Sequence, residues 1–281
     1  MHVDNPGAVV VTGATDGVGR GLAMRLAADG TDLIVHGRSA EKGRELVAEL
    51  RAAGAGRVAY ELADFASLTE ISALADRLLG YERISVLVNN AGIGVELERQ
   101  ESRDGHELTF QVDYLAAYLL SCRLAPLLAA SAPARIVNVT SAGQAPIDFD
   151  DVMLRRGWDG VQAYCQAKLA QIMLTIDLAE ALRPAGVSVN SLHPASYMPT
   201  KIVTHLYTPR SPLAEGVENV RRLVQDPLPP GETGLYLNRD AVAEPLAQAL
   251  DPAARARLRE LSERLTGVAL EGEDERAGQG A

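Results

Sequence analysis

The 281-residue sequence contains only two cysteines, Cys122 and Cys165. They fit no metal-ligand spacing and are too few for a disulfide framework, so we expect no metal site and a reducing, cytoplasmic location. Cys165 directly follows Tyr164, but no histidine is spaced to activate its thiol. We therefore interpret Cys165 as a small packing residue rather than a nucleophile.

Positive charge is also scarce, with 27 Lys and Arg against 37 Asp and Glu and a net charge of −10. A protein that binds duplex nucleic acid usually carries a basic face, and the sequence has no Lys/Arg cluster that could form one. We interpret the acidic excess as a solvated surface and expect no nucleic-acid partner.

Targeting signals and long hydrophobic runs are missing as well. Residues 1–7 lack the basic stretch and apolar run of a signal peptide. No apolar segment reaches the roughly 18 residues that suggest a membrane helix. We therefore expect a cytoplasmic protein with no membrane partner, and the 47% hydrophobic composition is enough for a sizeable core.

Apolar, β-branched runs alternate with longer helical patterns, which is typical of a parallel sheet covered by helices on both faces. The expected strands are Ala8–Thr12, Asp32–His36, Arg57–Glu61, Ile84–Asn89, Arg135–Thr140, Val187–Leu192 and Gly234–Leu237. The expected helices are Val18–Ala28, Ala40–Ala53, Leu68–Leu79, Asp104–Leu128, Gln162–Leu182 and Ala254–Leu265. This order predicts an α/β fold, a single Rossmann-type doubly wound parallel sheet of about seven strands.

No repeat or linker divides the chain, so we expect one domain over residues 1–270. Ser39 is a candidate N-cap, and Ser67-Leu68-Thr69-Glu70 matches a capping box. The Pro/Gly-rich stretch Asp226–Gly234 is expected to be a loop that leads to the last strand. Residues 271–281 are acidic and poor in apolar side chains, which predicts a disordered tail.

A glycine-rich turn, Thr12-Gly13-Ala14-Thr15-Asp16-Gly17-Val18-Gly19, follows the first strand and opens a helical pattern. Its three glycines would allow a tight turn, close approach of the backbone to a pyrophosphate, and close helix–strand packing. The helix start adds free N–H groups and a positive dipole end, so the segment predicts a dinucleotide site. The residues expected to line it are Gly13, Thr15, Asp16, Gly17, Val18 and Gly19.

The end of the second strand favours NADP(H) over NAD(H). An NAD site usually has a carboxylate there to bind the ribose 2′-hydroxyl, but Asp32 lies at the opposite end of this strand. Gly37 and Arg38 lie at the relevant end, and a guanidinium can form charge-assisted bonds to a 2′-phosphate. The alternative is that Arg38 only opens a solvated helix.

Tyr164 and Lys168 are four residues apart, which puts them on one face of a helix. A free tyrosine has a pKa of about 10, and we expect the ammonium and an oxidised nicotinamide to lower it. Ser141 follows a strand, at the edge where α/β proteins bind ligands. A Tyr/Lys pair at this spacing is frequent by chance. Its occurrence in this order with Ser141 and Asn89-Asn90-Ala91-Gly92 makes the catalytic interpretation stronger.

With these segments the sequence resembles the short-chain dehydrogenase/reductase family, from near its start to about Leu265. The matching pieces are the Thr12–Gly19 turn, Asn89 to Gly92, Ser141, Tyr164 and Lys168. Further segments resemble the retinol-dehydrogenase-like branch. They are the long Ser141–Tyr164 interval, His36-Gly37-Arg38, Phe110-Gln111-Val112, Gly234-Leu235-Tyr236 and Leu258 to Glu263.

The resemblance implies that Tyr164 is the general acid in reduction and the base in oxidation. It implies that Lys168 holds the nicotinamide ribose and that Ser141 binds the substrate oxygen. Asp113 stands where the family usually has an asparagine of the proton relay, so its charge is expected to alter the relay and its pH dependence. Further implied cofactor contacts are Ser39, Glu61, Leu62, Asn90, Ala91, Gly92, Pro194 and Thr200, together with Arg38, Tyr164 and Lys168.

Two of these cofactor assignments depart from the family pattern. Glu61 stands where an adenine-contacting aspartate is expected, and Asp64 is the alternative acid. Pro194 is followed by Ala195 instead of glycine, and Thr200 lies one position further along than usual.

The leading interpretation is hydride transfer between NADP(H) and the carbonyl or secondary alcohol of a small molecule. Apolar side chains in the expected lid, residues 196–215, favour a lipophilic substrate, with the insert 144–160 as the other wall. The alternatives are a non-redox dinucleotide sensor or scaffold, and a lyase or isomerase that uses the same tyrosine. A homodimer through the two long helices and a monomer both stay open.

Overall fold

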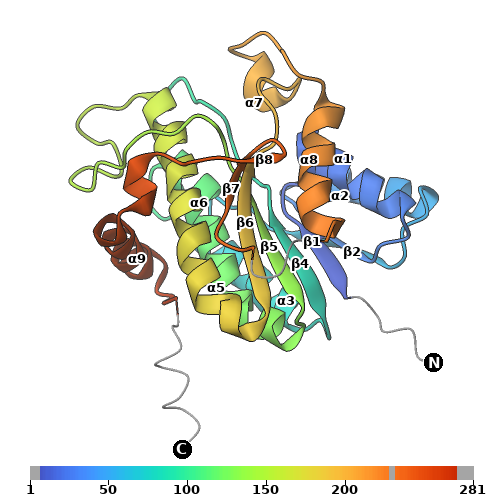
Figure 1. Cartoon of the computed structure of the whole chain (residues 1–281). Helices are drawn as coiled ribbons and strands as arrows, with labels where there is room; N and C mark the ends of the chain where they lie inside the picture. Colours follow the sequence, from blue (N-terminus) through green and yellow to red (C-terminus); the bar gives the residue numbers. More distant parts are fainter. Residues whose placement is uncertain (1–6, 228–231, 271–281) are drawn as a thin grey trace, which may run out of the picture.

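The computed structural model describes residues 7–227 and 232–270. Its centre is an eight-stranded sheet in the order β3-β2-β1-β4-β5-β6-β7-β8, parallel except for the last pair (Figure 1). The strands are β1 (Ala8–Val11), β2 (Leu33–Gly37), β3 (Val58–Leu62), β4 (Ile84–Asn89), β5 (Ala134–Val139), β6 (Val187–His193), β7 (Tyr236–Asn238) and β8 (Ala241–Val242). The predicted fold class is confirmed. The additional strand, β8, is too short to leave a pattern in the sequence.

Helices cover both faces of this sheet (Figure 1). One face carries α1 (Gly17–Ala28), α2 (Ala40–Ala52) and α8 (Leu213–Gln225). The other carries α3 (Leu68–Leu79), α5 (Ala116–Ala130), α6 (Gly160–Leu182) and the outer helix α9 (Pro252–Thr266). Short 3-10 turns lie at Arg183–Ala185 and Ala247–Leu250.

The strands are apolar at successive positions because both of their faces are buried. In β1, Val9 and Val11 pack into the core under α1, α2 and α8. Val10 points the other way, into the core shared with α3, α5 and α6. Side chains alternate between the faces of a strand, so a strand with two covered faces must be apolar throughout.

The helix expected over Asp104–Leu128 is wrong at its start. Helical structure begins with α4 (Leu108–Phe110), passes through a π-helical turn at Gln111–Leu115 and continues as α5. The carboxylate of Glu107, just before α4, accepts hydrogen bonds from the backbone N–H groups of Thr109 and Phe110 and caps the helix there.

This stretch also corrects the expectation about membrane helices. Leu108–Ala130 is long and apolar enough to cross a membrane by length and composition, and it is the one such helix in the described residues. In the fold, 72% of its most apolar window is buried inside the protein. We therefore interpret it as a core helix.

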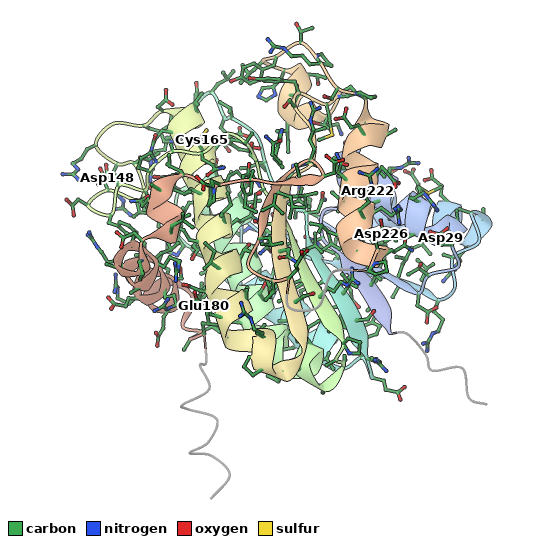
Figure 2. All side chains as sticks on the ribbon, in the orientation of Figure 1. Asp29, Asp148, Cys165, Glu180, Arg222 and Asp226 are labelled. Carbon is green, nitrogen blue, oxygen red and sulfur yellow. The ribbon has the colours of Figure 1, made fainter. Side chains whose placement is uncertain are left out.

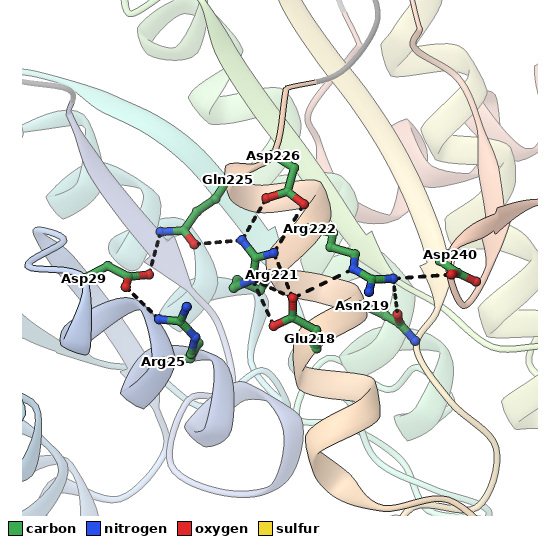
Figure 3. A network of polar contacts seen from close by, with 9 residues as sticks. All are labelled: Arg25, Asp29, Glu218, Asn219, Arg221, Arg222, Gln225, Asp226 and Asp240. Atoms are coloured by element: carbon green, nitrogen blue, oxygen red, sulfur yellow. Dashed lines mark hydrogen bonds and ion pairs between the residues drawn. The ribbon is translucent and has the colours of Figure 1, made fainter.

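Helix α8 is the main element that the sequence interpretation missed, because the segment before it was assigned to the lid as a whole. Val217 meets Gly21 of α1, and Val220 and Val224 are buried in the core next to α1. Polar contacts join the same two helices, since Gln225 Nε2 donates to Asp29 Oδ2 over 3.2 Å (Figure 3). The end of the expected lid, residues 213–215, therefore belongs to α8. The rest of the lid, residues 196–212, has no helix except α7 (Lys201–Thr204).

Two predicted helix starts are confirmed. Ser39 Oγ accepts a bond from Lys42 N, and Ser67 Oγ accepts one from Glu70 N. The capping box is only half formed, because Glu70 binds the N–H of Asp64 instead of that of Ser67. Part of the expected loop 226–234 and the whole expected tail 271–281 lie outside the described residues.

A buried ion cluster attaches α9 to α6. Asp177 of α6 binds Arg255 at 2.7 Å and Arg259 at 2.8 Å, and only 4% of its side chain is exposed. The C-terminal segment also reaches α5, where Tyr118 Oη donates to the carbonyl of Val268 over 2.9 Å. These contacts hold the outer helix against the two long central ones.

We predict that Asp177→Ala lowers the free energy of unfolding by about 3 kcal/mol, because it leaves buried Arg255 without its main counter-ion. Urea unfolding followed by circular dichroism measures this loss. The control is Asp76→Ala, which removes a 64%-exposed partner of Arg123 and should cost less than about 1 kcal/mol. Equal losses in the two variants would contradict the prediction.

Candidate active site

The sheet order reverses between β1 and β4, and the carboxyl ends of these two strands are tied together. Thr12 Oγ1 donates to Val88 O at 3.1 Å and accepts from Asn90 N at 2.9 Å. Asn90 Nδ2 donates to Thr12 O at 2.8 Å, so its amide holds the turn after β1. Ligands of doubly wound folds bind at such a reversal point.

The glycine-rich turn lies at this point and needs its glycines. Gly13 has φ +64° and Gly17 has φ +54°. A Cβ on Gly13 would lie 2.7 Å from the Cα of Ala91, which shows how closely the two segments approach. Asp16 Oδ1 caps α1 by accepting from Gly17 N over 2.8 Å. The start of α1 therefore lies at the carboxyl ends of β1 and β4 and has the geometry of an anion site.

His36 supports this turn, a role that the sequence interpretation missed. Its Nδ1 accepts from Gly13 N at 3.3 Å and its Nε2 bonds Ala63 O at 3.0 Å. Its ring also stacks on Phe65 with the centroids 4.3 Å apart. Burial lowers the pKa of His36 to about 4, so the ring is neutral and can accept at one nitrogen while donating at the other. A buried histidine in an otherwise apolar strand was the available signal.

The end of β2 fits a phosphorylated adenosine ribose. Gly37 lies so close to Thr15 that an added Cβ would meet Thr15 Cγ2 at 2.7 Å. Arg38 follows with an exposed side chain, and Ser39 caps α2. Asp32 is bound at the opposite end of the strand, where its carboxylate accepts from Arg57 N over 2.6 Å. These residues fit NADP(H): the turn and α1 would hold the pyrophosphate, and Arg38 the 2′-phosphate.

The structure does not direct the carboxylate of Glu61 at the candidate dinucleotide site. Its carboxylate accepts bonds from Arg77 Nε at 2.6 Å and from Tyr81 Oη at 3.1 Å, both from the α3 side. Asp64, the alternative acid, caps Ala66 N and pairs with Arg103. Leu62 is exposed at the end of β3.

The candidate catalytic residues meet at the ends of β4 and β5. Ser141 directly follows Thr140 at the end of β5, where its Oγ accepts from Gly143 N at 3.0 Å and its hydroxyl lowers the pKa of Tyr164. Tyr164 and Lys168 lie one turn apart on α6, with Lys168 Nζ 5.6 Å from the centre of the tyrosine ring. Lys168 Nζ also lies 3.0 Å from Asp113 Oδ2, and these two side chains are only 7% and 0% exposed.

Asp113 reaches this position from the π-helical turn before α5. Its Oδ1 accepts from Ile93 N over 2.7 Å, and Gly92 leaves room for it, since a Cβ there would lie 3.1 Å from Oδ2. Single π turns in long helices are frequent at functional sites. The turn therefore directs a carboxylate, buried and ion-paired, at the lysine.

Lys168 lowers the pKa of Tyr164, as expected, but the net pKa of this tyrosine is raised. Burial raises it most, the lowering effects of Lys168 and Ser141 do not compensate, and Asp113 raises it further. For Lys168, burial alone would lower the pKa, but attraction to Asp113 and Tyr164 outweighs burial and raises it. The site thus holds a protonated phenol beside a charged ammonium.

A buried chain of side chains positions Lys168 from below, and the sequence interpretation did not include it. Lys168 Nζ donates to Gln171 Oε1 at 3.2 Å. Thr175 Oγ1 donates to Gln171 O and accepts from Asn138 Nδ2, and Asn89 Nδ2 donates to Asn138 Oδ1. These polar residues on β4, β5 and α6 orient the lysine toward the ends of the strands.

Cys165 lies near the start of α6, directly after Tyr164 (Figure 2). A Cβ on Gly143 would lie 3.2 Å from its Sγ and 3.4 Å from Ser141 Oγ. Burial raises the pKa of the Cys165 thiol, which disfavours the thiolate that a nucleophile needs. This agrees with a packing residue at the edge of the site.

The segment after β6 brings Thr200 against the glycine-rich turn, where Thr200 Cγ2 would lie 3.3 Å from a Cβ on Gly17. The carbonyl of Pro194 accepts from Asn219 Nδ2 at 2.8 Å. His193 Nε2 bonds Ser196 Oγ at 3.0 Å, which ties the end of β6 to the start of the lid.

A sequence model described as "short chain dehydrogenase" matches residues 7–210, which include the turn, Asp113, Ser141, Tyr164 and Lys168. The chain belongs to this family. Mouse retinol dehydrogenase 13 is 38% identical to this short-chain dehydrogenase over 191 residues, which cover 66% of this chain and 57% of that protein. Human retinol dehydrogenase 14 is 30% identical over 292 residues, covering 92% of this chain and 86% of that protein.

Among solved structures, a short-chain dehydrogenase from Burkholderia cenocepacia J2315 in complex with NADP is similar, with a TM-score of 0.67 and 28% identity. The match covers 84% of this chain and 97% of that one. Within the family, this short-chain dehydrogenase falls in the retinol-dehydrogenase-like branch, as its sequence motifs predicted.

We predict that Gly13→Ala lowers the free energy of unfolding of this short-chain dehydrogenase by about 2–4 kcal/mol, because a Cβ meets backbone at a positive φ. The matched control is Gly30→Ala, which also has a positive φ (+76°) but meets nothing within 4 Å. It should cost only about 1 kcal/mol. Thermal and urea unfolding compare the two, and equal losses would mean that contact with Ala91 does not matter.

Proposed function

We propose that this short-chain dehydrogenase is an NADP(H)-dependent oxidoreductase acting on the carbonyl or secondary alcohol of a lipophilic small molecule. The observation that carries the proposal is the arrangement of Tyr164 with Ser141 close enough to lower its pKa and with charged Lys168 one helical turn away, 5.6 Å from the centre of the tyrosine ring. All three groups lie on the edge of the sheet that also carries the glycine-rich turn. One substrate could therefore be reached both by the proton donor and by a bound dinucleotide.

The cofactor part of the proposal rests on the start of α1 and the end of β2. N–H groups after Gly17 would hold the pyrophosphate, and Arg38 would bind a 2′-phosphate at the end of β2, which itself carries no carboxylate. The Burkholderia relative described above is in complex with NADP, which supports the same choice. When bound, the nicotinamide supplies or accepts the hydride. The residues of the chain bind and orient the cofactor and the substrate, and they move the proton.

The proton chemistry follows from the state of Tyr164. Burial raises its pKa, so it is a phenol at neutral pH and can donate its proton to a carbonyl oxygen. Ser141 can hydrogen-bond that same oxygen and stabilise the charge that develops on it. Lys168 stabilises the phenolate left behind. In oxidation the phenolate takes the proton of the alcohol.

A lipophilic substrate is supported by the side chains of the lid. Tyr197 and Tyr207 lie with ring centroids 5.2 Å apart and are both 39% exposed, and Leu206 is 38% exposed. Two of the similar proteins described above carry the name retinol dehydrogenase, and retinol is itself apolar.

We predict that Tyr164→Phe lowers kcat for NADPH-dependent reduction of a lipophilic aldehyde by roughly 10²–10⁴-fold, because the proton donor is lost. NADPH binding, measured by fluorescence titration, should stay within about twofold, since the ring is kept. The control is Tyr118→Phe, which removes a hydroxyl bonded to Val268 O, remote from Lys168. Tight NADPH binding with no turnover in the wild type would favour a sensor instead.

We predict that Asp113→Asn shifts the pH profile to lower pH. The negative charge of Asp113 raises the pKa of Tyr164, and asparagine removes that charge while its oxygen can still accept from Ile93 N. Reduction needs the phenol, so its alkaline decline should begin at lower pH. Oxidation needs the phenolate, so its rise should also come at lower pH.

The rates of both directions, measured across the alkaline range, test this shift. The control is Asp177→Asn, which changes another buried, ion-paired aspartate of the same core but lies beside α9. An unchanged profile in Asp113→Asn would mean that Asp113 does not act on Tyr164.

A further inference from the structure

The short helix α7 brings a lysine of the lid to the opposite end of the dinucleotide site. Lys201 Nζ lies 2.5 Å from Asp16 Oδ2, at the start of α1. The sequence contains three lysines, and the other two are Lys168 of the candidate active site and Lys42 of α2. Two of the three lysines therefore lie in or beside the candidate dinucleotide site, and Lys168 lies in the catalytic cluster.

Lys201 does not stand alone at this position. Lys42 is a side-chain neighbour of Lys201, and Arg38 is a second charged neighbour. The charge of Lys42 also lowers the pKa of Asp16. Asp16 thus lies beside two lysines, and Arg38 lies near one of them, in a protein whose net charge is −10. Like charges gathered in this way are stabilised by an anion between them.

The backbone around these cations agrees with an anion site at the end of β2. Ser39 caps the first turn of α2 by accepting from Lys42 N. Gly37, at the end of β2, lies directly against Thr15 of the glycine-rich turn. Arg38 and Lys42 therefore come from the β2–α2 connection, whereas Lys201 comes from the lid. This is the end of the crevice at which a 2′-phosphate would lie.

The lid is anchored at its other side as well. His205 Nε2 bonds the carbonyl of Val95 at 2.9 Å, and Ile202 packs on Gly94, which has no room for a Cβ there. The segment after β6 therefore crosses from the loop after β4 to the loop after β1. A group that binds Lys201 will hold this whole segment in place.

We propose that Lys201 is a third cation for the 2′-phosphate of NADP(H), together with Arg38 and Lys42, and that this phosphate fastens the substrate lid. The inference rests on the proposed NADP(H) dependence. Asp16 holds Lys201 near the site before the phosphate binds, and the phosphate then competes for the ammonium. Lys201 is thereby a specificity residue that links the choice of cofactor to the position of the lid.

The test measures binding of adenosine 2′,5′-bisphosphate and of adenosine 5′-monophosphate by calorimetry, without any substrate. Lys201→Met should weaken the bisphosphate roughly three- to tenfold and leave the monophosphate unchanged, since one charge-assisted contact is lost. The control is Arg44→Met, which removes a positive charge exposed on α2 two residues beyond Lys42. It should change neither affinity.

A second pair of variants separates direct contact from neutralisation of Asp16. Asp16→Asn keeps the cap on Gly17 N, because asparagine is an equally good N-cap. If Lys201 contacts the phosphate, Asp16→Asn with Lys201→Met binds the bisphosphate more weakly than Asp16→Asn alone. Equal binding would mean that Lys201 only neutralises Asp16, and that outcome overturns the proposal.

The lid supplies an independent readout. The bisphosphate should slow trypsin cleavage after Arg210 in the wild type, and this protection should be lost in Lys201→Met. A wild type that binds both nucleotides equally would instead refute the NADP(H) preference itself. A wild type that prefers the bisphosphate, with Lys201→Met unchanged in affinity and protection, would refute only the role of Lys201.

Discussion

The candidate active site depends on one buried ion pair, between the ammonium of Lys168 and the carboxylate of Asp113 at 3.0 Å. Neither charge could be kept so far from water without the other, because an unpaired buried ion is strongly destabilising. The pair joins α6 to the π-helical turn before α5, and Ile93 N binds the remaining carboxylate oxygen. The charged state of Lys168 beside Tyr164 therefore depends on a residue from another helix.

Burial and that ion pair together set the pKa of the tyrosine. Burial raises the pKa most, and Asp113 raises it further, because its carboxylate compensates part of the charge by which Lys168 would favour the phenolate. Tyr164 is consequently a neutral phenol in the neutral pH range. In the proposed function, the pH dependence of both directions of the reaction would then depend on Tyr164.

The parallel sheet explains why distant segments meet. The strands from β1 to β7 all run parallel and end at the same edge of the sheet. Gly13 after β1, Gly37 at the end of β2, Asn90 after β4 and Ser141 after β5 therefore lie along one edge. The segment after β6 crosses this edge and reaches both Val95 and Asp16. The candidate dinucleotide site and the candidate catalytic residues are thus joined by one segment of the chain.

The sequence by itself determined the features that arise within a few residues of chain: the doubly apolar strands, the turn from Gly13 to Gly19, and the caps Ser39 and Ser67. Backbone geometry and neighbouring side chains decide such features, so their signals are local. Only the tertiary structure decided the net pKa of Tyr164 and the binding of Glu61 to Arg77. Desolvation and charge pairing depend on which distant groups pack around a side chain, and no local pattern records that.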